Sequence, residues 1–320
     1  MNFAFTDEQR EFRDLARRFL QDTLPLDRVA AIADSAEGWD PSSWTDLADM
    51  GWLGATVAED LGGTGLGYIE QAILLEELGR ALYAGPYLST ILALPALGPD
   101  QQASVAVGEA RWSIEVDGLV PDLDRVDCVV TADGATTAEG EMLASIDPTR
   151  PVGRLQVGGH TPLPGTTDRA VVLSGLASEA LGVACRALEI GVEYVKERKQ
   201  FGKAIGTYQG ISHPLADTFS DIELAHSLVY AAAWTLSAEP AGALRAASIA
   251  KAFATEVAVA ATERAIQVHG GIGFTWEHPL HRFYKRALWL QAFAGYPSEL
   301  RGIVRDALLP QTGPHQAKGA

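Results

Sequence analysis

Three short stretches of this sequence contain residue types that could do chemistry. Asp168 and Arg169 stand side by side where a long apolar run begins. The carboxylate could work as an acid or base, or it could simply cap a helix. Arg198, Gln200 and Phe201 lie in a strongly charged stretch, where the guanidinium and the amide could hold a phosphate or a carboxylate. Taken alone, a charged stretch of this kind favours a solvated turn.

The third stretch is rich in glycine. It begins at Gln267 and includes Gly270 and Gly271. Glycines allow a ligand to approach the backbone where a side chain would block it. A single Gly-Gly-x-Gly pattern is weak evidence for a binding site, and we expect His269 to be a buried or hydrogen-bonded histidine rather than a catalytic one.

These stretches are set in a chain whose pattern changes twice. Apolar residues at helical spacing predict helices up to about residue 100, and helices again from Asp168 to about residue 309. Between them, short β-rich runs beginning with "SVAVGEARWSIEV" are separated by Asp, Gly and Pro, which is typical of strands and turns. The pattern predicts a mainly α fold with a small β domain. The expected divisions are a helical domain at 1–102, a β domain at 103–165, a helical bundle at 166–310 and a flexible tail at 311–320.

The helix that follows Asp168 has an unusually thin polar face. Its charged residues from Glu179 to Lys196 are spaced by three, four or seven positions, so they share one narrow stripe. Such a helix is largely buried. We therefore expect its first turn, and Asp168 with it, to face an interior cleft.

Composition excludes several classes of function. The 25 Lys+Arg and 41 Asp+Glu give a formal net charge of −16 with no basic run, so neither nucleic acid nor an anionic membrane is an expected partner. Cys128 and Cys185 lie far apart without a CxxC pair, which argues against disulfides or a metal site and suits a reducing cytoplasm. The N-terminal stretch lacks the pattern of a signal peptide. We expect a cytoplasmic protein without a metal.

Taken together, the motifs resemble those of a known family. They are "GWLGATVAEDLGGTGLG" with "EELGRAL", then "ERKQFGKAIGTYQGISHPLAD", then "QVHGGIGFTWEHPLHRFYKRA". In this order and spacing they are similar to the acyl-CoA dehydrogenases, over roughly residues 5 to 100 and 165 to 305. The resemblance implies an N-terminal helical domain, a middle β domain and a C-terminal four-helix bundle.

The resemblance also implies a cofactor and a reaction. In this family a carboxylate removes the α-proton of an acyl-CoA thioester, and the β-hydrogen passes as hydride to flavin N5 of FAD, which gives a 2-enoyl-CoA. The electrons then pass to an electron-transfer flavoprotein or a similar acceptor. Family members bind FAD across a subunit interface. The positions that would hold the pyrophosphate and adenine end of a neighbour's FAD are Arg198, Gln200, Phe201, Gln267, Gly270 and Gly271.

The middle domain departs from the family pattern. The threonine-glutamate-proline and glycine-serine-aspartate signature that lines the flavin ring is not found between residues 103 and 165. A chain with the distal FAD contacts but without the ring contacts resembles one half of a shared site. This favours the shorter subunit of a heteromeric acyl-CoA dehydrogenase, of the kind that actinobacteria use in steroid or fatty acid degradation, within a dimer or heterotetramer. A homo-oligomer with a trimmed β domain remains an alternative.

The position of the family's catalytic glutamate departs from the family pattern as well. The family's usual glutamate directly precedes a glycine, and here Ala294 precedes Gly295. We expect Glu299, which aligns poorly with that position, to be a solvated helix residue. Some family members carry the base at the start of the first C-terminal helix, directly before an arginine, and this position is Asp168. Asp168 is therefore the candidate base, and Arg169 would orient it or bind the substrate.

Two other functions fit these residues. The chain could be a non-catalytic partner that completes the FAD site of a full-length subunit. It could also support another flavoenzyme reaction, the oxidation or hydroxylation of a substrate without CoA. The net charge of −16 mildly favours this alternative because CoA is itself a polyanion.

Overall fold

The N-terminal third is helical, as predicted. The computed structural model describes residues 4–156 and 158–309, so the expected tail at 311–320 lies outside the described residues. The helices of this third are α1 (Asp7–Thr23), α2 (Leu26–Ala33), α3 (Pro41–Asp49), α4 (Tyr68–Arg80), α5 (Tyr87–Ala93) and α6 (Pro99–Ala106), with 3-10 turns η1 (Glu59–Leu61) and η2 (Leu94–Ala96). Thr6 and Gln9 form a reciprocal capping box that fixes the start of α1.

One expected β-rich run is helical. α6 extends through "SVA" and crosses the expected boundary at residue 102, so the prediction of a strand at its start is wrong. Pro99 lies in the first turn of this helix, where its missing N–H costs nothing. Val105 and Ala106 are buried in the main core, so tertiary packing outweighs the β propensity of Val105.

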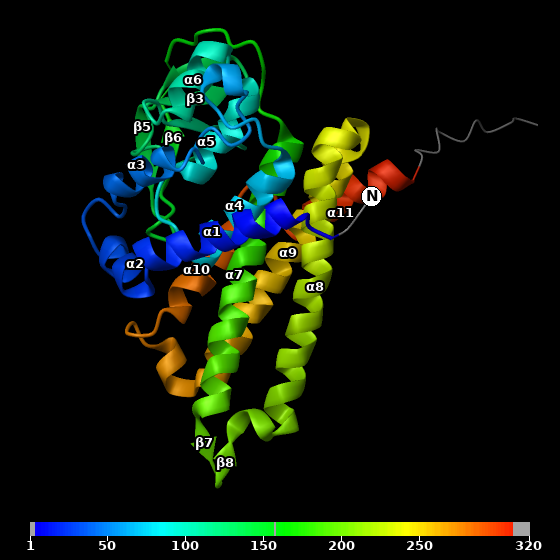
Figure 1. Cartoon of the computed structure of the whole chain (residues 1–320). Coiled ribbons are helices and arrows are strands. Elements are labelled where there is room, and N and C mark those ends of the chain that lie inside the picture. Colours follow the sequence, from blue (N-terminus) through cyan, green and yellow to red (C-terminus); the bar gives the residue numbers. More distant parts are fainter. Residues whose placement is uncertain (1–3, 157, 310–320) are drawn as a thin grey trace, which may run out of the picture.

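The β domain consists of two small sheets. Its strands are β1 (Trp112–Ile114), β2 (Val120–Pro121), β3 (Cys128–Thr131), β4 (Gly134–Thr137), β5 (Gly140–Leu143) and β6 (Val152–Leu155). One sheet has the order β1-β3-β4, with β1 parallel to β3, and the other has the antiparallel order β2-β6-β5. The sheets lie beside α5 and α6 at the upper end of the molecule in Figure 1. The first sheet joins the main core through Ile114 and Val130.

The C-terminal half is an elongated bundle below this head (Figure 1). Its elements are α7 (Arg169–Glu197), strands β7 (Lys199–Gln200) and β8 (Lys203–Ala204), the 3-10 turn η3 (Ile205–Thr207), α8 (Gln209–Ala238), α9 (Pro240–His269), the 3-10 turn η4 (Gly270–Phe274), α10 (Leu280–Ala292) and α11 (Pro297–Leu308). α7 packs against α4, α8, α9 and α10. It is long and apolar enough to cross a membrane, but 89% of its apolar window is buried inside the protein, as in the core helix of a globular bundle.

Backbone contact joins α4 to α7. A Cβ added to Gly79 would lie 2.2 Å from the carbonyl oxygen of Glu179, and one added to Gly182 would lie 1.9 Å from that of Glu76. Both distances are shorter than any real Cβ contact. These two glycines therefore allow the helices to approach with no side chain between them.

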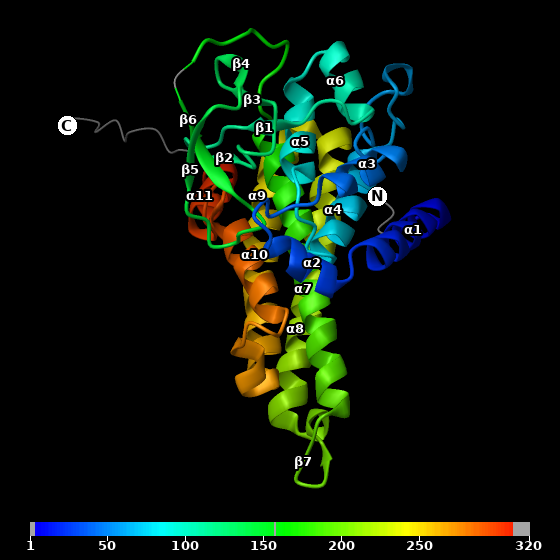
Figure 2. The ribbon, with the colours of Figure 1, turned by 90° about the vertical axis from the view of Figure 1, so that its left-hand side faces the viewer.

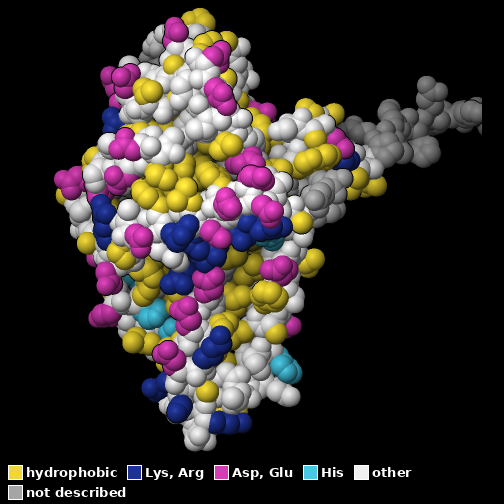
Figure 3. Space-filling model, viewed as in Figure 1, with side chains coloured by type: hydrophobic (Ala, Val, Ile, Leu, Met, Phe, Trp, Pro, Cys, Tyr) yellow, Lys and Arg dark blue, Asp and Glu magenta, His cyan; other side chains and the backbone are white. Residues whose placement is uncertain are grey.

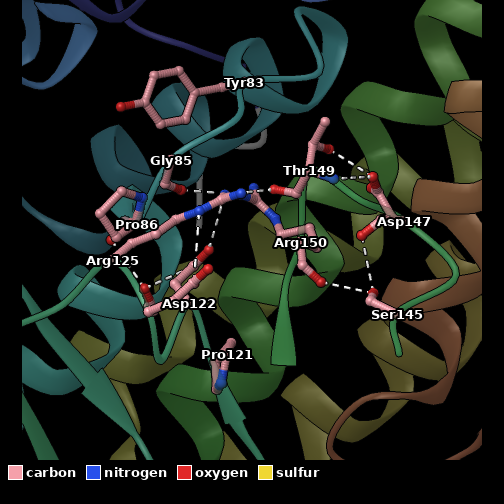
Figure 4. A network of polar contacts seen from close by, with 12 residues as sticks. Tyr83, Gly85, Pro86, Pro121, Asp122, Arg125, Ser145, Asp147, Thr149 and Arg150 are labelled. Carbon is pink, nitrogen blue, oxygen red and sulfur yellow. Dashed lines mark hydrogen bonds and ion pairs between the residues drawn. The ribbon is translucent and has the colours of Figure 1, made fainter. Parts of the chain in front are cut away.

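A buried ionic cluster connects the three parts of the chain. The Arg286 guanidinium of α10 donates to Asp147 Oδ2 at 2.6 Å and to Glu179 Oε1 at 2.5 Å. Arg150 donates to the same Glu179 oxygen at 2.7 Å. It also donates to the Gly85 carbonyl at 3.0 Å (Figure 4). Although burial alone would raise the pKa of Asp147, its contacts with Arg286 and Thr149 hold that pKa below the usual value. The expected polar stripe of α7 thus begins with a buried residue, Glu179.

Candidate functional site

Asp168 is the N-cap of α7. Its Oδ1 accepts hydrogen bonds from the backbone N–H groups of Ala170 at 2.8 Å and Val171 at 3.4 Å. The side chain is exposed, so this chain alone does not provide the interior cleft that we expected. Asp168 lies near Tyr68, at the start of α4. The pKa of the Tyr68 phenol is raised, first by burial and second by the negative charge of Asp168. The helix cap is confirmed, and the second carboxylate oxygen is free of the cap.

Arg169 points to a different neighbour. A Cβ added to Gly295 would lie 3.6 Å from Arg169 Nη2 and 3.2 Å from Glu299 Oε2. Both charged groups therefore lie against the turn between α10 and α11. Ala294 in this turn is buried and has a left-handed φ of 59°. Glu299 is exposed in the first turn of α11, as predicted. Consecutive residues of a helix point about 100° apart. Asp168 therefore lies toward α4, and Arg169 lies toward the turn that should carry the family's glutamate.

Lys251 lies beneath the same turn and was missed in the sequence. Its side chain is fully buried, and Nζ donates to the Gly295 carbonyl at 2.6 Å and to the Gln291 carbonyl at 3.3 Å. Burial first and the nearby Arg169 second lower the pKa of Lys251 to about 7. A lone lysine among small and apolar residues, in "SIAKAFA", was the signal that could have identified it.

Replacing Lys251 with methionine is expected to flatten the dependence of stability on pH. The pKa of Lys251 is about 7 in the folded protein, whereas its ordinary value is 10.5. Between pH 7 and pH 10.5 the unfolded chain therefore binds a proton at this residue that the folded chain lacks. Stability from this group therefore rises with pH, by up to about 1.4 kcal/mol per pH unit. Urea unfolding of both proteins across this window measures the difference. If the stabilities of the two proteins change with pH in parallel, the low pKa of Lys251 is contradicted.

The predicted FAD residues Arg198, Gln200 and Phe201 lie at the far end of α7. The stretch forms a hairpin of β7 and β8 rather than a plain turn. Phe201 and Gly202 have φ values of 52° and 84°, as a type I′ turn requires, and Phe201 is 94% exposed. Arg198 and Gln200 are exposed beside it. Lys and Arg side chains gather around this lower tip in Figure 3, so a local basic surface exists despite the acidic total.

The glycine stretch lies at the same end. Gln267, Gly270 and Gly271 are exposed where α9 meets η4, and Gly270 has φ 64° and ψ −140°, a conformation that glycine adopts readily. His269 is buried and stacks on Tyr194 of α7 with ring centroids 4.0 Å apart. This contact ties the two segments together. The prediction of a buried, hydrogen-bonded His269 is confirmed, because its ring also contacts the Ala265 carbonyl at 2.7 Å.

The structure thus brings together two separate groups of predicted residues. Asp168 and Arg169 begin α7, and Arg198 follows its end, 29 residues later. At 1.5 Å per residue this separates the groups by about 43 Å. No single site on the described part of the chain contains both.

Comparisons with known proteins agree with this architecture. Residues 6–103 match the family model described as acyl-CoA dehydrogenase, N-terminal domain, and residues 174–309 match acyl-CoA dehydrogenase, C-terminal domain. Acyl-CoA dehydrogenase IpdE2 of Mycobacterium tuberculosis is 38% identical over 81% of this chain and 84% of its own length. The chain belongs to the acyl-CoA dehydrogenase family.

Solved acyl-CoA dehydrogenase structures have the same fold. A structure titled Tcur3481-Tcur3483 steroid ACAD G363A variant has a TM-score of 0.85 and 26% identity, covering 94% of this chain and 98% of that chain. The ChsE4-ChsE5 complex from Mycobacterium tuberculosis has a TM-score of 0.85 at 23% identity, covering 96% and 99%. The family's oxidoreductase chemistry on CH–CH groups and its fold, with helices around a small β domain, are confirmed.

The family's cofactor can be tested against the bundle end. A guanidinium, two amides, an aromatic ring and two glycine backbones are available there, and they suit a pyrophosphate and an adenine. A Cβ at Gly270 or Gly271 would meet nothing within 4 Å, so the described residues of this chain leave the glycine backbone open. These residues fit the distal half of FAD.

Proposed function

We propose that this chain is a subunit of a heteromeric, FAD-dependent acyl-CoA dehydrogenase that converts a bulky acyl-CoA to its 2-enoyl-CoA. One observation carries the proposal: the residues that the resemblance assigns to FAD are exposed on an open surface about 43 Å from Asp168. The similar ChsE4-ChsE5 structure is a complex of two proteins, and the similar Tcur3481-Tcur3483 structure is a steroid ACAD, which supports a heteromer and a bulky acyl group. The unpaired Cys128 and Cys185 suit a cytoplasmic location.

The chain's residues would act in two places. Arg198 and Gln200 would donate to the pyrophosphate of a partner subunit's FAD, with Phe201 against the adenine and the backbone of Gly270 close to the phosphates. FAD, when bound, supplies the acceptor for the β-hydrogen, and an electron-transfer flavoprotein or a similar protein would take the electrons. Asp168 would remove the α-proton of the substrate through the carboxylate oxygen that the helix cap leaves free.

The Arg169 guanidinium would orient the substrate or the carboxylate. Arg169 is the first residue of α7 and lies beside the turn at Gly295. An arginine there offers a positive charge near the thioester of the polyanionic acyl-CoA. The net negative charge of the chain otherwise repels this ligand.

A non-catalytic partner is the second candidate. Asp168 is exposed, one of its oxygens is engaged in the cap, and Ala294 replaces the usual base. In this case the chain would complete the partner's FAD site and contribute no proton transfer.

Replacing Arg198 with alanine in the co-expressed heteromer is expected to weaken FAD retention roughly tenfold or more, because a charge-assisted contact to a phosphate is lost. Flavin absorbance per complex after dialysis measures this loss. Arg305→Ala, which removes an exposed arginine from α11, is the matched control and should retain FAD. Equal retention by both variants, or a chain that is saturated with FAD when purified alone, would contradict the shared site.

A further inference from the structure

A buried lysine ties the end of α10 to the start of α11. Lys251 lies on α9, which packs against both of these helices and lies beside them in Figure 2. Its Nζ donates to the Gln291 carbonyl at 3.3 Å and to the Gly295 carbonyl at 2.6 Å. The first carbonyl belongs to the last turn of α10, where backbone acceptors have no partner within the helix. The second lies two residues before α11 begins. One ammonium group therefore holds both ends of the connecting turn.

The turn that Lys251 holds has a strained backbone. Ala294 has φ 59°, in the left-handed region that a residue with a Cβ rarely adopts, and Gly295 follows with φ 106°. Strain of this kind persists only where surrounding contacts fix it, and it gathers at functional sites. Among the described residues, no side chain other than Lys251 donates a hydrogen bond to the backbone of residues 291–296. The shape of the turn therefore depends on this lysine.

Arg169 lies on the other side of the same turn. A Cβ added to Gly295 would lie 3.6 Å from Arg169 Nη2, so the guanidinium lies against the glycine backbone. Arg169 is exposed, and it forms no hydrogen bond or ion pair with another described residue. Its position is therefore set by packing against the turn, and a displaced turn would displace the guanidinium with it.

Packing alone does not account for a lysine at position 251. Burial lowers the pKa of Lys251 to about 7, with the nearby Arg169 as the second cause, so the charged form is disfavoured here. A methionine would fill similar space without this cost. What the lysine adds is a pair of donors for two carbonyls that would otherwise be buried without a partner.

We propose that Lys251 is a positioning residue for the acyl-CoA site at the start of α7. It acts through the turn at Ala294 and Gly295, which seats the Arg169 guanidinium next to Asp168. The lysine itself does not touch the ligand. The identity of the ligand rests on the proposed function, whereas the contacts between Lys251, the turn and Arg169 do not depend on it.

Lys251→Met in the full chain tests the structural step without any ligand. Loss of both hydrogen bonds should speed amide hydrogen exchange across residues 289–296 roughly tenfold or more, because the end of α10 and the turn open more often. Exchange followed by mass spectrometry measures this. Thr262→Val is the matched control, since Thr262 is buried about three turns further along the same face of α9 and donates to the Ala258 carbonyl at 2.9 Å. It should leave exchange at residues 289–296 unchanged.

Steady-state oxidation of cholyl-CoA, a fused-ring acyl-CoA, by the assembled complex tests the functional step. Lys251→Met should raise KM roughly tenfold and change kcat little, because a displaced Arg169 loses binding that substrate and transition state share. Arg169→Met should do the same. The double variant should be no worse than Arg169→Met alone, because the lysine acts through the arginine. Thr262→Val should keep the original KM.

Gly295→Ala reaches the turn from the other side and leaves Lys251 in place. The new Cβ would lie against Arg169, and φ 106° is strained for alanine, so KM should rise by a similar factor. Unchanged exchange in Lys251→Met, unchanged KM in both turn variants, or additive losses in the double variant would overturn the proposal. A complex that neither binds nor oxidises cholyl-CoA would instead contradict the proposed function, and the exchange measurement would still decide the role of Lys251.

Discussion

Turnover of the assembled complex is expected to fall by about 10²–10⁴ when Asp168 is replaced with asparagine, which is the usual contribution of a general base. Asparagine keeps the shape of the side chain and is an equally good N-cap, so the two hydrogen bonds to Ala170 and Val171 should survive. The variant removes the basicity of the carboxylate and leaves the start of α7 intact. Steady-state formation of enoyl-CoA measures the effect.

Two further variants separate catalysis from capping. Asp40 caps α3 in the same way, accepting from the Ser42 N–H at 2.9 Å, so Asp40→Asn is a matched change at a cap remote from α7. It should leave turnover unchanged. Asp168→Ser retains capping with a shorter, non-basic side chain and should be as inactive as the asparagine variant. If Asp168→Asn turns over at the original rate, the residue is a cap alone and the non-catalytic partner becomes the better description.

Replacing Arg286 with methionine is expected to reduce the free energy of unfolding by about 3–5 kcal/mol, because it leaves buried Asp147 without its arginine partner and buried Glu179 with Arg150 alone. Arg286 is fully buried and contacts Asp147, Glu179 and the Tyr83 carbonyl, so the change affects the β domain, α7 and the N-terminal helices together. Urea unfolding followed by circular dichroism measures the loss.

An exposed ion pair provides the control for this variant. Arg301 pairs with Glu256 while its side chain is 57% exposed, and such surface pairs contribute about 0–1 kcal/mol. Arg301→Met should therefore change stability little. If Arg286→Met loses no more than Arg301→Met, the buried cluster does not hold the three parts together.

Local sequence signals predicted the features that depend on neighbouring residues. The start of α7 at Asp168 follows from a good cap before an apolar run, and the burial of α7 follows from its thin polar stripe. The prediction of a strand at residues 103–106 was wrong, because a proline about one turn earlier and core packing favour a helix there. The FAD residues were identified through the family resemblance and not from their own chemistry.

Contacts between distant segments could not be predicted in the same way. Arg286 meets Glu179 across 107 positions of sequence, and Lys251 meets Gly295 across 44. Each looks like an ordinary charge in its own segment, and only the packing of α9 and α10 removes it from water. The different directions of Asp168 and Arg169 likewise depend on where α4 and the α10–α11 turn lie around α7.

The glycine contact between α4 and α7 limits how this molecule can move. Packed helices slide past one another through small rearrangements of interdigitated side chains. At Gly79 and Gly182 there are no side chains to rearrange, because backbone lies directly on backbone. The N-terminal helices and the bundle therefore behave as one rigid body along this seam. The β domain is joined to that body through side-chain contacts, such as those of Arg150 and Asp147.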